Sequence, residues 1–172
     1  EVYQSAMPLA NSQEKSNLIS MIAATYTEKG DFKSAQKHID DAIKRTDADN
    51  FKFQKATIYM AKSQHEKAVT LLDTLLDDNP NHEEILLNRA ESHMALKQYD
   101  LAKEDFSTLQ SFAPNDPRSY HRLAQIAKEQ NQNGEELTNY TLFLKYVDRE
   151  SVPAEELKRI ETRMKQLPGS TE

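Results

Sequence analysis

Residues 83–114 read EEILLNRAESHMALKQYDLAKEDFSTLQSFAP, and small and large apolar residues recur in this stretch at helical spacing. The pattern predicts two short antiparallel helices, with Pro114 where the second helix must stop. A helix of about a dozen residues is marginal in water unless its apolar stripe is covered. The stretch therefore predicts a helical hairpin that needs neighbouring units on either side.

Small side chains repeat along the chain at a nearly constant separation. Two series of alanines show it, one at residues 23, 56, 90 and 124 and the other at residues 35, 68 and 102. The separations are 33, 34 and 34 residues in the first series (56−23, 90−56, 124−90) and 33 and 34 in the second (68−35, 102−68). A period of this length is typical of stacked helical hairpins.

The period and its slots resemble the tetratricopeptide repeat family from Ser16 to about Val147. Within residues 83–114, four positions carry the residue that is typical of the family at that place in the repeat. They are Ala90, Ala102, Phe106 and Pro114. The resemblance implies an all-α fold, a right-handed superhelix of about four helical hairpins with a C-terminal capping helix.

The repeat register divides the chain. Residues 1–11 are interpreted as the second helix of a preceding repeat, with a frayed tail as the alternative. The hairpins are expected at 12–48, 49–82, 83–116 and 117–150, and Glu136 makes the fourth divergent because it occupies a small slot and should splay the pair. Residues 151–167 are expected to form an amphipathic helix that covers the last repeat, and residues 168–172 a disordered tail.

Start and stop signals refine these boundaries. Ser12 is an expected N-cap, and Asn81 with Glu84 is an expected capping box. Gly30 should end the first helix in the left-handed conformation, and Gly134 should open the second helix of the fourth repeat.

The composition argues against several function classes. The net charge is −6, the mean hydropathy is −0.82, and there is no run of Lys or Arg. These features indicate a soluble protein and make nucleic acid an unlikely partner. No stretch approaches the roughly 18 apolar residues of a membrane span, so no membrane insertion is expected. The cellular compartment stays open.

The residues that usually carry chemistry are missing or scattered. Cysteine is absent, which excludes disulfides and thiolate sites. The chain has no glycine-rich phosphate loop, no G-x-S-x-G and no H-E-x-x-H. His93 lies in a slot normally given to tyrosine and is expected to be structural. We therefore expect no enzyme, no cofactor and no metal.

The resemblance implies that the first helix of each repeat lines the binding face of the array. The side chains come from the second, fifth, sixth, ninth and twelfth positions of the repeat. In this sequence they are Asn17, Ser20, Ala24, Thr27, Asn50, Phe53, Gln54, Thr57, Met60, Glu84, Leu87, Asn88, Glu91, Met94, Arg118, His121, Arg122, Gln125 and Lys128.

Two groups stand out in this set. The first group consists of apolar side chains at positions that would be polar on a purely structural face. Such side chains suggest a peptide-binding surface. Basic or amide side chains fall at three of the five positions that chaperone-binding members use to clamp a terminal carboxylate, a task suited to the arginine fork. The predicted partner-binding residues are Phe53, Met60, Leu87, Asn88, Met94, Arg118, His121 and Arg122.

The departure from that clamp is also visible, because Phe53 and Thr57 stand where its first repeat carries Lys and Asn. The favoured function is a protein-interaction scaffold that binds a protein or peptide, with an acidic or C-terminal carboxylate group as one version. The alternatives are a structural spacer or oligomerisation module of a larger protein, which would form homo-oligomers, and ordinary helix surface without a ligand.

Overall fold

The computed structural model describes residues 11–46 and 48–169. The chain divides into two compact units, Glu1–Leu96 and Lys97–Glu172. The boundary falls inside the third expected hairpin, whose first helix belongs to unit 1 and whose second belongs to unit 2. The helix expected at residues 1–11 and the tail expected at 168–172 lie largely outside the described residues.

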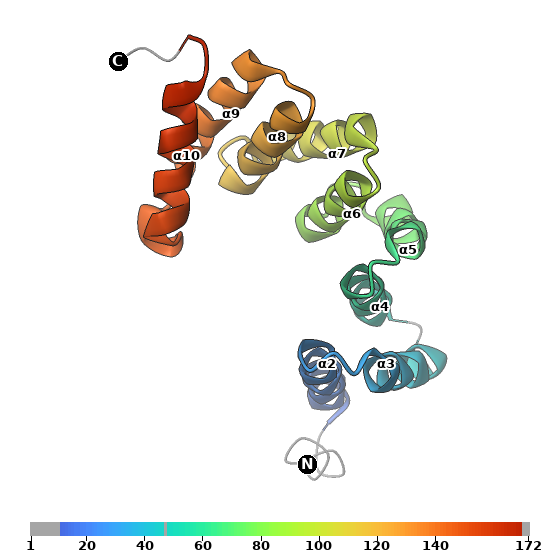
Figure 1. Ribbon diagram of the computed structural model, residues 1–172. Helices are drawn as coiled ribbons and strands as arrows, with labels where there is room; N and C mark the ends of the chain where they lie inside the picture. The colour runs from blue at the N-terminus through green and yellow to red at the C-terminus, as the bar shows by residue number, and fades with distance from the viewer. Residues whose placement is uncertain (1–10, 47, 170–172) are drawn as a thin grey trace. The chain divides into compact units, whose positions relative to one another are not determined.

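Unit 1 consists of helices joined by short turns over its described residues (Figure 1). α2 packs against α3, α4 against α5, and α5 against α6. α2 also touches α4, and α4 touches α6, so the first helices of successive hairpins are neighbours. The helices are α2 (Ser12–Glu28), α3 (Phe32–Thr46), α4 (Asp49–Ala61), α5 (His65–Asp78) and α6 (Glu83–Ala95).

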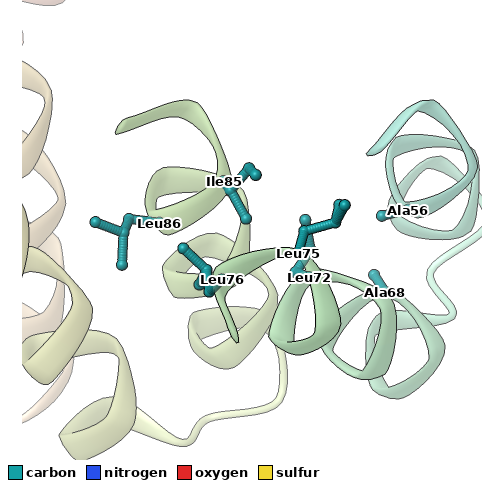
Figure 2. Packing of buried hydrophobic residues seen from close by; sticks show 7 residues of the cluster. All are labelled: Ala56, Ala68, Leu72, Leu75, Leu76, Ile85 and Leu86. Atoms are coloured by element: carbon teal, nitrogen blue, oxygen red, sulfur yellow. The ribbon is translucent and has the colours of Figure 1, made fainter. Parts of the chain in front are cut away.

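The fully buried alanines lie where helices meet. Ala56 on α4 and Ala68 on α5 are 0% exposed and belong to one apolar cluster. Figure 2 shows the side chains of Leu72 and Leu75 pointing from α5 toward the space between α4 and α6, where Ile85 faces them. A second cluster joins α2 and α3 to α4 through Ala23, Ala35, Ile39, Ala42, Phe51 and Ile58.

Unit 2 contains α7 (Tyr99–Phe112), α8 (Pro117–Glu129), α9 (Asn133–Tyr146), the short 3-10 helix η2 (Arg149–Ser151) and α10 (Ala154–Gln166). α8 packs against α9, α7 touches α8, and α10 touches α9. α8, α9 and α10 share a buried apolar cluster formed by Ala124, Tyr140, Phe143, Leu157 and Ile160. α10 thus covers the apolar side of the last hairpin, as the expected capping helix should. The expected all-α fold of tandem helical hairpins is confirmed.

The turn inside each hairpin uses a left-handed residue. Gly30, Ser63, Lys97 and Asn131 have φ angles of 75°, 56°, 59° and 57°, and they recur at 33, 34 and 34 residues (63−30, 97−63, 131−97). In three of these turns the following N–H donates to a carbonyl five residues earlier, as in a Schellman motif. Only Gly30 is a glycine, so the sequence marked one of the four turns.

The observed caps correct three expectations. Asn11, rather than Ser12, caps α2, and it forms a capping box with Glu14. The capping box expected at Asn81 is wrong, because α6 starts at Glu83 and its N-cap is His82, whose side chain makes no capping bond. Gly134 lies inside α9, which begins at Asn133.

Glu136 has a role that its slot did not suggest. Its side chain is 0% exposed, and both carboxylate oxygens accept hydrogen bonds of 2.8 Å from Arg163 of α10. Arg163 belongs to the capping helix α10, and its guanidinium lies against Glu136 of α9. A two-bond ion pair therefore ties the capping helix to the last hairpin.

Candidate functional site

A groove of about 450 Å³ lies along α2 and α4 of unit 1. Five of the positions that the resemblance assigned to the binding face line it, two of them from α4. The lining residues are Ser20, Met21, Ala23, Ala24, Thr27 and Glu28 from α2, and Gln54, Thr57 and Ile58 from α4. Sequence reasoning missed Met21, whose side chain is unusually exposed for a methionine, at 45%.

The groove hydroxyls donate to their own helices. Ser20 Oγ donates to the Ser16 carbonyl, Thr27 Oγ1 to Ala23 and Thr57 Oγ1 to Gln54, at 2.8 to 3.0 Å. Such bonds leave the hydroxyl protons engaged within the protein. The remaining polar groups of the lining are the Gln54 carboxamide and the Glu28 carboxylate.

Gln54 links the two helices that form the groove. Its Nε2 donates to Ser20 Oγ across 34 residues of sequence, at 2.5 Å. Its Oε1 is buried and accepts no hydrogen bond. An amide oxygen shielded from water and without a donor raises the free energy of the protein by about 1–3 kcal/mol. This groove therefore contains an unsatisfied acceptor.

None of the predicted partner-binding residues of unit 1 lines this groove. Phe53 and Met60 are half-buried and pack against the cluster around Ala56. Leu87 is 7% exposed, so little of its apolar surface is accessible, and Met94 is half-buried. Asn88 donates through Nδ2 to the Glu84 carbonyl at 2.6 Å. The structure thus places much of the predicted apolar seat in or beside the core.

The predicted basic residues belong to unit 2, on α8. Arg118 donates from Nε and Nη2 to Asp116, with distances of 2.7 to 3.1 Å, and Asp116 is also the N-cap of α8. Arg122 donates to Gln125 Oε1 at 3.1 Å. An incoming carboxylate would have to displace Asp116 from Arg118, which weakens the expected clamp.

His121 lies in the α8–α9–α10 core of unit 2. Its ring stacks on Phe143 with centroids 4.8 Å apart, and Tyr140 lies at 6.3 Å. Its Nε2 is 3.6 Å from a Glu156 oxygen on α10, and the side chain is 19% exposed. Burial, helped by Arg122, lowers the pKa of His121 below 6.5, and Glu156 only partly opposes this. His121 therefore favours its neutral form.

The lowered pKa predicts a pH-dependent stability. The unfolded state takes up a proton near pH 6.5 while folded His121 stays neutral, so this part of the stability is lost as the pH falls below about 6.5. We expect thermal unfolding scans at about pH 7.5 and 5.5 to show a smaller loss for His121→Gln than for the original chain. The same substitution at exposed His82 should leave the loss unchanged; equal losses in all three proteins would contradict the assignment.

Neither a metal-binding cluster nor a membrane-spanning helix occurs among the described residues. No three or more His, Asp or Glu side chains in residues 11–46 and 48–169 gather where they could hold a metal ion. Over the same residues, no helix combines the length and apolarity needed to cross a membrane.

Comparison with known proteins supplies the family. A tetratricopeptide repeat model matches residues 59–132, from within α4 to the turn after α8. Those residues belong to the tetratricopeptide repeat family. The assignment agrees with the 33- and 34-residue period, and the recognition made from that period is confirmed. No curated protein matches the chain.

Solved tetratricopeptide repeat structures extend the likeness to most of the chain. A tetratricopeptide repeat protein from Parabacteroides merdae has a TM-score of 0.74 at 20% identity, covering 95% of this chain and 65% of its own. This chain thus spans less than two thirds of that protein. A thermophilic TPR protein from Thermus thermophilus has a TM-score of 0.72 at 16% identity, covering 95% and 86%. At these identities the likeness shows the fold.

One similar structure contains a ligand. The first TPR of Spaghetti, bound to the HSP90 peptide SRMEEVD, has a TM-score of 0.58 at 17% identity, covering 68% of this chain and 93% of its own. The bound peptide carries three acidic residues and one basic residue. Tetratricopeptide repeats are in general non-enzymatic scaffolds for protein interactions.

Proposed function

We propose that this chain is an interaction scaffold that binds a segment of a partner protein on the face formed by the first helices of its repeats. The groove between α2 and α4 carries the proposal. Its volume of about 450 Å³ falls within the roughly 300–1,000 Å³ of ligand-binding pockets. Its lining comes from two consecutive first helices, as expected for repeats that bind through this face.

A packed apolar core lies directly behind the groove. Ala23 and Ile58, which reach the groove lining, are 2% exposed and belong to the cluster that joins α2, α3 and α4. A surface held in this way is formed before the partner arrives, so ordering it consumes little of the binding free energy. An extended segment can therefore bind without a rearrangement of unit 1.

The basic side chains of α8 support the proposal less strongly. Arg118 already has a carboxylate partner in Asp116, which also caps the helix. Recognition of an acidic or C-terminal group there requires Asp116 to give up that bond. For this reason we place the main contact in unit 1 and assign Arg118 and Arg122 no necessary role.

Selection of random 12-residue peptides displayed on phage against the immobilised full chain tests this function. We expect enriched peptides with dissociation constants of about 1–100 μM, whose addition shifts the backbone amide resonances of Ser20, Ala24 and Thr57. Light scattering should show a monomer at micromolar concentration. A stable dimer without enriched peptides would favour the oligomerisation module and overturn the proposal.

A further inference from the structure

We infer that the α2–α4 groove recognises the main chain of an extended peptide segment that is uncharged or basic, through the Gln54 carboxamide. The inference rests on the proposed function and names the chemistry of the ligand. It starts from the unsatisfied Gln54 Oε1 and from the distribution of charge along the groove.

In the free protein, the amide nitrogen of Gln54 is hydrogen-bonded but the amide oxygen is not. Nε2 donates to Ser20 Oγ, while Oε1 has no donor. The terminal torsion of a glutamine has a broad energy minimum, so Oε1 can turn toward the groove, and Nε2 then gives up its bond to Ser20 Oγ. A peptide N–H is a strong donor available at every residue of an extended segment except proline. The ligand N–H would supply the donor that Oε1 lacks in the free protein.

The charges of the lining select against acidic ligands. Glu28 is the one ionisable residue among those that line the groove. Its carboxylate repels an acidic ligand, and no lysine or arginine is among the described residues of the lining. A segment such as SRMEEVD should therefore bind worse than a neutral or basic one.

The walls favour small or flexible contacts with the ligand. Ala23 and Ala24 leave room for the backbone of a segment to approach α2. Met21, 45% exposed, offers a flexible thioether that adapts to different side chains. Main-chain recognition beside adaptable apolar contacts predicts a ligand defined more by its extended shape and charge than by one sequence.

The experiment measures binding of one selected peptide by fluorescence anisotropy. Gln54→Leu, which keeps the size of the side chain, should weaken binding about tenfold, while its thermal stability should change little, because removal of the unsatisfied acceptor offsets the lost bond to Ser20. Methylation of one backbone nitrogen of the peptide should cause a similar loss. Ala24→Trp, which fills the groove, should abolish binding. The matched controls are Ala61→Trp and Gln166→Leu, both at exposed positions outside the lining.

A second set of binding measurements tests the predicted preference for uncharged or basic peptides. Replacing two neutral residues of the peptide by glutamate should weaken binding at low salt, and Glu28→Lys should reverse that effect. If peptides bind and Ala24→Trp blocks them, but neither Gln54→Leu nor any N-methylation changes the affinity, the inference is overturned and the proposed function stands. Preference for acidic peptides overturns it equally. Enrichment of no peptide at all overturns both.

Discussion

Replacement of Arg163 by methionine is expected to lower the thermal unfolding midpoint of the chain by about 6–12 °C. The substitution leaves the Glu136 carboxylate buried, at 0% exposed, without its two hydrogen bonds of 2.8 Å. A buried carboxylate stripped of its partner costs roughly 3–5 kcal/mol, and each kcal/mol moves the midpoint by about 2–4 °C in a chain of this size. We take the lower part of the range because water reaches the Arg163 side.

The capping helix supplies a matched control. Arg159 donates to Glu155 at 2.8 Å, but both side chains are about three quarters exposed, at 76% and 77%. Arg159→Met should therefore leave the midpoint almost unchanged. A double variant, Glu136→Leu with Arg163→Met, should recover most of the loss because it removes both charges. Equal effects of Arg163→Met and Arg159→Met by circular dichroism would show that the pair does not hold α10.

A leucine at Ala56 is expected to destabilise the chain by roughly 2–3 kcal/mol. Ala56 and Ala68 are both 0% exposed and meet where α4 packs on α5 (Figure 2). The added carbons have no space there, so α4 and α5 must move apart or the new side chain must leave its preferred rotamer. Urea unfolding monitored by circular dichroism measures the free-energy change.

The same substitution on the same helix provides the comparison. Ala61 is the last residue of α4 and is exposed, so Ala61→Leu should change the free energy of unfolding by no more than about 0.5 kcal/mol. If Ala56→Leu unfolds at the same urea concentration as the original chain, close helix contact at the repeated alanines is not what the fold requires.

The repeating architecture could be predicted from the sequence because the residues that determine it are local and recur periodically. An alanine where two helices cross has the same packing role in every hairpin. The alanines at positions 23, 56, 90 and 124 therefore predict the repeat more strongly together than any one of them alone. The helix caps were harder to predict from the sequence. A one- or two-residue shift of a helix start turns Asn81 from a cap into a residue before it, and three left-handed turns use residues other than glycine.

The sequence predicted several of the positions that line the α2–α4 groove, but it did not predict the chemical character of that groove. The register named Ser20, Ala24 and Gln54 among the facing residues, and they line the groove. Apolar character alone drew attention to Phe53 and Leu87, whose side chains contribute to packing or have little exposed surface. Sequence distinguishes apolar from polar residues, but it does not say whether an apolar side chain at a given position faces a groove or fills a core.

By itself, the sequence determined that this chain is a series of helical hairpins, because small side chains recur at equivalent positions of successive hairpins with a period of 33 or 34 residues. Only the tertiary structure decided which polar groups are satisfied. Glu136 finds Arg163 27 residues away, and Gln54 finds Ser20 34 residues away but leaves its oxygen without a donor. Such pairings depend on distances between side chains of different helices, and a hydrogen bond is lost within about an ångström of misplacement.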